Sequence, residues 1–314
     1  MAEREFDLPE LVRAKLATAG AVGDQWSASL PHLVNDLEHR WDLRVGDVLD
    51  GGSTAFVASA QRTDGTPAVL KIAVPGQPID EQVEALVRAD GLGHVQVLEV
   101  DLPRQALLLE RLGPSLAESG LPPEEQVDIL CATLHRAWQV PRAPGREVRP
   151  EQEKAAALVR HVIDAWLQLG QPCPAAVIER AVTCAERRAA DFDLASSVVV
   201  HGDPHPGNCL QALTARAGAE SGFVLVDPDG FLADRGYDLG VVLRDWRPQL
   251  REDPGLLPRL CRRMAERTGV APEVIWEWGL LERVSTGLYL MEFGSRAQGG
   301  AFLASAAMLD LRPS

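Results

Sequence analysis

Residues 198–210 read Val-Val-Val-His-Gly-Asp-Pro-His-Pro-Gly-Asn-Cys-Leu, a short apolar run that stops abruptly at His201. An acid, two prolines, a glycine and an amide follow before the chain becomes apolar again. Residues 223–230, Phe-Val-Leu-Val-Asp-Pro-Asp-Gly, repeat this design, with a second short strand that ends on Asp227. Two neighbouring strands that each end on a carboxylate predict a site for a metal ion and phosphate groups.

The spacing of the polar residues in this stretch indicates which kind of reaction the site could catalyse. His201, Asp203 and Asn208 reproduce the H-x-D-x-x-x-x-N pattern of kinase catalytic loops. In such a loop the acid must reach the proton of an acceptor hydroxyl, while the amide reaches a magnesium ion beside the nucleotide phosphates. Asp227 then supplies a charged oxygen to the same ion, which needs few protein ligands. The alternative is a β-hairpin with polar loops, because Asp, Asn, Gly and Pro also favour turns.

The composition of the whole chain sets the class of protein. Its 314 residues are 46% apolar and 24% charged, which is typical of a soluble globular protein with one large domain or two modest ones. The net charge of −14 argues against a nucleic-acid partner and suits a cationic small molecule. We expect no signal peptide and no membrane span. Five cysteines without a CxxC pair predict reduced thiols and a cytoplasmic protein.

The first third of the chain is predicted to be helical and then rich in strands. Residues 5–41 have helical spacing, with Pro31 near the start of a helix. Thr63-Asp-Gly65 is a hairpin signal between two strands. An amphipathic helix follows at 79–87, and a Gly-Pro break at 113–114 predicts a domain boundary. The expected strands are 45–49, 55–61, 67–74, 95–101 and 106–110.

Lys71 is an unusual residue for an apolar strand. It is either a charge that protects an edge strand or a ligand for nucleotide phosphates. Glu81 or Glu84 of the following helix has the right chemistry to orient it. The loop Asp50-Gly-Gly-Ser-Thr54 could cover phosphates with its backbone N–H groups, although on its own it is more typical of a turn.

The remaining two thirds of the chain are predicted to be mainly helical, interrupted by the catalytic hairpin, whose tip spans 212–221. This order of elements predicts an α+β protein. The expected helices are 123–140, 151–169, 175–192, 237–244, 254–268, 272–291 and 297–309.

From about Trp26 onward, the order of elements and the motif at 201–208 resemble the aminoglycoside phosphotransferase family. The streptomycin 6-phosphotransferase and hydroxyurea-resistance kinase branch is the most similar within it. The resemblance implies a bilobal, protein-kinase-like fold. Residues 1–112 would form a small, mostly antiparallel nucleotide-binding lobe with one key helix and a helical extension, and residues 113–314 a larger helical lobe with the catalytic loop and acceptor site. The shared motifs are Leu30-Pro31, Arg40-Trp-Asp-Leu43, Asp64-Gly-Thr66, Leu108–Leu112 and Asp227-Pro228.

The resemblance also implies roles for individual residues. Asp203 would act on the acceptor hydroxyl, and Asp-Pro-Asp-Gly in place of Asp-Phe-Gly makes a protein-kinase activation loop unexpected. The role of His205 stays open. The implied ATP ligands are Lys71 with Glu81 or less readily Glu84, Ser53 and Thr54 for the phosphates, and the backbone of Glu110 to Leu112 for adenine. The implied Mg²⁺ ligands are Asn208 and Asp227, with His201 and Asp238 as structural supports.

The expected activity is therefore ATP- and Mg²⁺-dependent phosphorylation of an aminoglycoside by a monomer or homodimer, as in antibiotic resistance. Alternatives are a kinase of the same fold for another small hydroxyl metabolite or hydroxyurea, and a non-catalytic nucleotide-binding protein. A zinc site at His201 and His205 is a third alternative, but it needs a further ligand. Candidates to bind a cationic acceptor are Asp234, Glu282 and Glu292, although each has the character of a solvated helix charge. Trp246, Trp276 and Trp278 are expected in the core.

Overall fold

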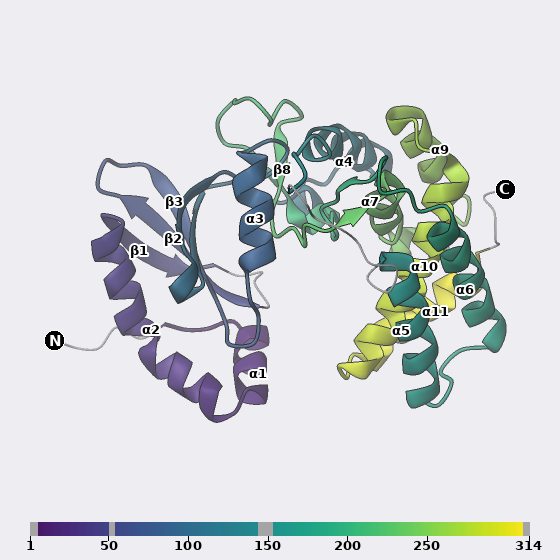
Figure 1. Cartoon of the computed structure of the whole chain (residues 1–314), viewed down its shortest axis with the longest axis horizontal. Helices are drawn as coiled ribbons and strands as arrows, with labels where there is room; N and C mark the ends of the chain where they lie inside the picture. The colour runs from purple at the N-terminus through teal and green to yellow at the C-terminus, as the bar shows by residue number, and fades with distance from the viewer. Residues whose placement is uncertain (1–5, 50–53, 144–152, 310–314) are drawn as a thin grey trace. The chain divides into compact units, whose positions relative to one another are not determined.

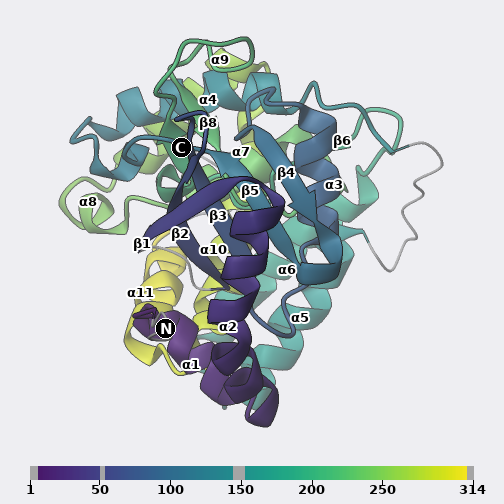
Figure 2. The same cartoon turned by 90° about the vertical axis from the view of Figure 1, so that its left-hand side faces the viewer.

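A computed structural model describes residues 6–49, 54–143 and 153–309. The chain forms two compact units, Met1–Gly113 and Pro114–Ser314, which meet in sequence at the Gly-Pro break. The first unit is an antiparallel sheet with helices, and the second is mostly helical, as Figures 1 and 2 show for each unit. This architecture confirms the predicted α+β, protein-kinase-like fold.

The first unit is built on a five-stranded sheet in the order β1-β2-β3-β5-β4, with every neighbouring pair antiparallel. Its core lies between the sheet and a long helix, where Leu30 and Leu37 pack with strand residues such as Leu70 and Leu108. Strand β3 is paired on both sides, so it is a central strand. The strands are β1 Leu43–Val48, β2 Ala55–Arg62, β3 Pro67–Ala73, β4 Val97–Asp101 and β5 Ala106–Glu110.

The helices of this unit are α1 (Glu10–Thr18), α2 (Ala21–Arg40) and α3 (Asp80–Ala89). The prediction that Pro31 lies near the start of a helix is wrong, because it lies inside α2. An interior proline removes a helix hydrogen bond and costs about 3 kcal/mol. Burial of Leu30 and its neighbours on the same face of α2 offsets that cost.

The second unit is organised around α10 (Pro272–Glu292), which packs against helices on several sides. Trp276 and Trp278 on α10 are buried, as is Trp246, which confirms their predicted place in the core. Helix α8 was not predicted. The other helices are α4 Pro123–Ala137, α5 Lys154–Gln168, α6 Ala175–Ala190, α7 Arg235–Leu243, α8 Arg247–Glu252, α9 Leu256–Thr268 and α11 Arg296–Ala307.

The strands around this motif form two small sheets, and one of them is the hairpin that the sequence predicted with its tip at 212–221. Strand β6 (Val198–Val199) pairs with β9 (Leu232–Ala233), while β7 (Cys209–Gln211) pairs with β8 (Phe223–Leu225). The pairing of β6 with β9 was not predicted, because strands of two residues carry too little side-chain alternation to specify their partner from sequence. None of the helices in the described ranges is both long and apolar enough to cross a membrane.

Candidate active site

His201 fixes the conformation of the loop that follows β6. Its side chain is fully buried, and its Nδ1 accepts a hydrogen bond of 3.1 Å from the Asp203 N–H. Nδ1 is therefore unprotonated, so Nε2 carries the proton and donates to the Val226 carbonyl at 2.8 Å. Because both ring nitrogens are engaged, His201 is a structural residue, and the alternative of a zinc ligand at this position loses its support.

Asp238 of α7 braces the same loop from the interior. Its Oδ2 accepts from the His201 N–H at 3.0 Å and from Trp138 Nε1 at 2.8 Å, and its Oδ1 accepts from the Gly202 N–H at 2.9 Å. The carboxyl is fully buried, and burial raises its pKa to about 6 although these hydrogen bonds favour the ionised form. Three donors around one buried carboxylate hold the first two loop residues in place.

Asp203 is held from one side by a cation. Nη2 of Arg244 donates to its Oδ1, and Nε2 of His205 lies 3.6 Å from its Oδ2. Burial would raise the pKa of the Asp203 carboxyl, but Arg244 and His205 outweigh burial and hold that pKa below its usual value. The side chain is 41% exposed, so an ionised carboxylate remains open to a ligand.

Asn208 and Asp227 are brought to this loop by backbone hydrogen bonds. The Val226 N–H donates to the Asn208 carbonyl at 2.9 Å, and the Asp229 N–H donates to the His201 carbonyl at 2.7 Å. Asp227 lies between these two anchor points and has a left-handed backbone with φ of 59°. The Asn208 amide Nδ2 donates to the Asp203 carbonyl at 3.0 Å, which directs its amide oxygen away from that carbonyl.

Lys71 belongs to the first unit, and its environment is described there alone. It is only 5% exposed and lies on β3 between Val57 of β2 and Leu107 of β5. Because β3 is central, the edge-strand explanation for this lysine is wrong. Its Nζ donates to Gln82 Oε1 at 2.9 Å, a partner on α3 that the sequence did not single out. Glu81 stays the predicted partner.

The other predicted nucleotide ligands have mixed outcomes. Ser53 lies outside the described residues, and the carbonyl of Thr54 accepts from the Val74 N–H at 3.0 Å. The N–H of Glu110 is used within the unit, where it donates to the Gln96 carbonyl at 2.9 Å, so this N–H is not the group that would bind adenine. An adenine contact at Leu112, which is buried, stays a prediction.

Two of the predicted acceptor carboxylates are structural partners within the second unit. Asp234 caps α7 by accepting from the Gly236 N–H at 2.8 Å, and it also accepts from Trp278 Nε1 at 2.9 Å. Glu282 is 5% exposed and lies 3.5 Å from Nη1 of Arg244, so its interpretation as a solvated charge is wrong. Glu292 is partly exposed and lies 4.0 Å from His161 Nε2, and its contact with an acceptor stays a prediction.

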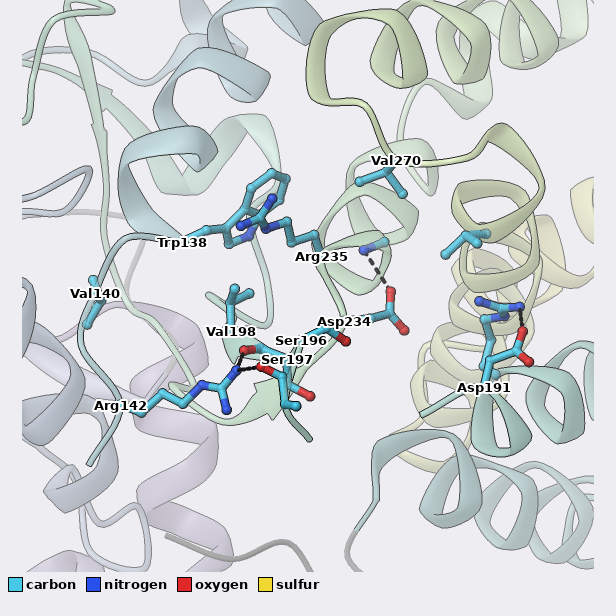
Figure 3. Close-up of a pocket in the computed structure, with 14 residues that line it drawn as sticks. Trp138, Val140, Arg142, Asp191, Ser196, Ser197, Val198, Asp234, Arg235 and Val270 are labelled. Atoms are coloured by element: carbon cyan, nitrogen blue, oxygen red, sulfur yellow. Dashed lines mark hydrogen bonds and ion pairs between the residues drawn. The ribbon is translucent and has the colours of Figure 1, made fainter. Parts of the chain in front are cut away.

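A cavity of about 650 Å³ in the second unit is lined in part by Trp138 and Asp234. Figure 3 shows Trp138 and Arg235 on one side of it, with the Arg235 guanidinium 5.8 Å from the Trp138 ring, and Arg142 and Ser197 on another. Among the described residues, its lining includes neither Asp203 nor the two predicted metal ligands. The cavity therefore contacts residues around the loop but not the three residues predicted for phosphoryl transfer.

Sequence reasoning missed four residues that shape the two sites: Trp138, Gln82, Asp229 and Arg244. Arg244 follows an apolar helix directly, and a charge next to the segment 239–243 was the available signal for a buried partner. Gln82 stands beside the two glutamates that were considered for Lys71. Trp138 lies 100 positions from Asp238, and nothing local to either residue links them.

The fold is of the protein-kinase-like class, and its loop brings Asp203, Asn208 and Asp227 together. Residues 40–294 match the family of aminoglycoside/hydroxyurea antibiotic resistance kinases, and the chain belongs to this family. This finding confirms the resemblance seen in the sequence.

Two curated relatives are similar to most of the chain. A hydroxyurea phosphotransferase of Kitasatospora aureofaciens is 34% identical in an alignment of 241 residues, which covers 73% of this chain and 65% of that protein. A streptomycin 6-kinase of Streptomyces glaucescens is 31% identical in an alignment of 245 residues, which covers 74% of this chain and 73% of that protein.

Among solved structures, the aminoglycoside phosphotransferase APH(4)-Ia in a ternary complex with AMP-PNP and hygromycin B is similar in fold. Its TM-score is 0.59 at 16% identity, with 88% of this chain and 98% of that chain covered. At this identity the likeness supports the fold alone.

Proposed function

We propose that this protein transfers the γ-phosphoryl group of ATP to a hydroxyl group of a small antibiotic, with an aminoglycoside of the streptomycin type as the first candidate. The observation that carries the proposal is the loop of the second unit, in which Asp203, Asn208 and Asp227 are tied to one another by hydrogen bonds through His201 and Val226. Phosphoryl transfer depends mainly on alignment and charge neutralisation, which such a loop supplies.

The donor atoms of the loop fit a magnesium ion. Mg²⁺ prefers hard oxygen ligands and completes its shell with phosphates and water, so one carboxylate and one amide suffice. Asp227 would supply the carboxylate. Asn208 would supply its amide oxygen, because its Nδ2 already donates to the Asp203 carbonyl. When bound, the ion would neutralise charge on the transferring phosphates.

In the proposed reaction the acceptor oxygen forms a bond to the γ-phosphorus while the bond from that phosphorus to the β,γ-bridging oxygen breaks. The hydroxyl proton passes to Asp203, and ADP leaves. Asp203 needs no raised pKa for this task, because the proton departs late in a loose transition state. Its ionised state, favoured by Arg244, suits a group that orients the hydroxyl and then accepts its proton. Lys71 would neutralise charge on the α- and β-phosphates.

The acceptor is proposed to be a cationic small molecule, because the chain carries a net charge of −14. Hydroxyurea is the second candidate, and the 34% identity to a hydroxyurea phosphotransferase favours it. The two candidates differ in charge and size, so they are separable by experiment.

The test is an ADP-release assay with streptomycin, a panel of other aminoglycosides and hydroxyurea, with each product mapped by mass spectrometry. We expect a phosphorylated product whose mass rises by one phosphoryl group. Failure to release ADP with every acceptor would exclude the proposed activity for these substrates.

The matched variants are Asp203→Asn and Asp253→Asn. Asp253 is an exposed partner of Arg259 in the same unit, so its variant controls for the loss of a surface charge. We expect Asp203→Asn to lower kcat by about 100-fold or more, with nucleotide affinity nearly intact. Turnover within about tenfold of the parent would remove Asp203 from this role.

A further inference from the structure

Arg244 is the first residue beyond α7, and its side chain ends beside Asp203. The side chain is only 15% exposed, and its Nη2 donates to Asp203 Oδ1. Arginine presents its donors in a rigid fork, so contacts on one part of the guanidinium fix the direction of the others.

Two residues of α10 fix the other end of this guanidinium. Nη1 of Arg244 donates to Thr286 Oγ1 at 3.0 Å and lies 3.5 Å from Glu282 Oε2. Glu282 is itself held in the interior, where it is only 5% exposed. Helices α7 and α10 lie side by side within the second unit (Figure 1). The guanidinium is therefore held by the packed pair of helices α7 and α10 as well as by the loop.

Because Arg244 binds only one of them, the two carboxylate oxygens of Asp203 have different surroundings. Oδ1 is occupied by Arg244, whereas Oδ2 lies 3.6 Å from His205 Nε2, which is beyond hydrogen-bond distance. His205 Nδ1 accepts from the Gly207 N–H at 3.1 Å, so the proton of its ring stands on Nε2 and faces the same carboxylate. Oδ2 is thus the oxygen that remains for an acceptor hydroxyl.

We propose that Arg244 is a positioning residue of the phosphoryl transfer: braced by Glu282 and Thr286, it binds Oδ1 of Asp203 and presents Oδ2 to the acceptor. The proposal rests on the proposed function above. It changes the predicted role of Glu282 from an acceptor ligand to a partner of Arg244. An error of about 1 Å in placing a catalytic group can cost about 100-fold in rate, so a residue that only orients Asp203 has a large kinetic effect.

The test compares Arg244→Ala with Arg263→Ala in steady-state kinetics. Arg263 pairs with Asp128 at 2.6 Å between α9 and α4, so its variant removes an equally well-paired arginine at a distance from the loop. We expect Arg244→Ala to lower kcat by about 100-fold with both KM values within about threefold, and Arg263→Ala to leave kcat unchanged.

Chemical rescue separates positioning from a general loss of structure. Added guanidinium at about 50 mM, far below the molar concentrations that unfold proteins, can fill the space left by the side chain. We expect it to raise kcat of Arg244→Ala about tenfold and to change neither the parent nor Arg263→Ala. A kcat of Arg244→Ala within about threefold of the parent, or a loss without rescue in a folded variant, would overturn the proposal.

Two further variants keep the proposal testable. If Arg244→Ala does not fold, Arg244→Lys retains the charge without the fork, and a kcat lowered at least about tenfold is expected. Glu282→Gln is expected to lower kcat about fivefold with the acceptor KM unchanged. An increase confined to the acceptor KM would assign Glu282 to acceptor binding and overturn its bracing role. If the parent protein phosphorylates no acceptor, the proposed function itself is wrong. If the parent is active and Arg244→Ala has the same kcat, only the positioning role of Arg244 is wrong.

Discussion

Replacing Gly202 with alanine adds one methyl group between the catalytic loop and Asp229, and its consequences can be estimated from the geometry. Gly202 has a φ of 96°, and a Cβ built there would lie 2.7 Å from both Cβ and Oδ2 of Asp229. Ordinary contact begins at 3.4 Å, so either residue must move by about 0.7 Å (3.4 − 2.7). Asp203 is the next residue, and the displacement therefore reaches the carboxylate that we propose as catalytic.

The matched control is Gly222→Ala in the same unit. Gly222 has a φ of 80°, but a Cβ there would meet nothing within 4 Å. A side chain in the left-handed region costs about 1–2 kcal/mol, which both variants share. The steric overlap adds about 1–3 kcal/mol in Gly202→Ala alone, for a total of about 2–5 kcal/mol.

The assay is urea unfolding of both variants combined with steady-state kinetics. We expect Gly202→Ala to lose about 1–3 kcal/mol more of the free energy of unfolding than Gly222→Ala. We also expect its kcat to fall about 10- to 100-fold, because the neighbouring carboxylate of Asp203 shifts. If the two variants lose equal stability and turn over at equal rates, the close approach of Asp229 does not constrain the loop, and the estimate is refuted.

Three further outcomes are expected. Asp227→Ala should weaken binding of Mg-ATP at least tenfold in calorimetry while leaving metal-free ATP binding unchanged, and unaltered Mg-ATP affinity would contradict its role as a metal ligand. Lys71→Met, which keeps the apolar stem, should raise the KM for ATP at least about tenfold, and a change below twofold would count against a phosphate contact. Burial lowers the pKa of His94 to about 4 in the folded state, below its ordinary value of 6.5, so the stability of the first unit is retained above pH 6.5 and falls by about 3 kcal/mol as pH falls to 4. His94→Gln should remove most of this acid sensitivity, as measured by amide hydrogen exchange at the two pH values.

The strands of the first unit were predictable because their side chains alternate. The pattern at 67–74 predicts β3, which the structure places at Pro67–Ala73. What the pattern could not supply was the position of β3 in the sheet. Only the pairing with both β2 and β5 shows that Lys71 does not protect an edge strand.

Helix α10 shows a signal that was present and not used. Its apolar residues surround the whole circumference, and a helix that is apolar all round is buried. A charge within such a helix is therefore buried with it and needs a partner, which for Glu282 is Arg244. The expectation of a solvated charge came from the general behaviour of glutamate and ignored the helix around it.

The candidate site was only partly predictable from the sequence. The residues proposed for chemistry lie close together in the chain, whereas the residues that support them lie far from them in the chain. The residues proposed for chemistry at the loop, Asp203 and Asn208, follow one another closely, so their spacing alone reveals them. The supports come from far away: Asp238 lies 37 positions from His201, and Trp138 lies 100 positions from Asp238. Each support is a hydrogen bond that satisfies a buried polar group, and such pairs are set by the packing of whole helices. A short motif can therefore predict what a loop does. Of the residues that hold the loop in place, Asp238 was expected only through the family resemblance, and Trp138 and Arg244 emerged only once the fold was known.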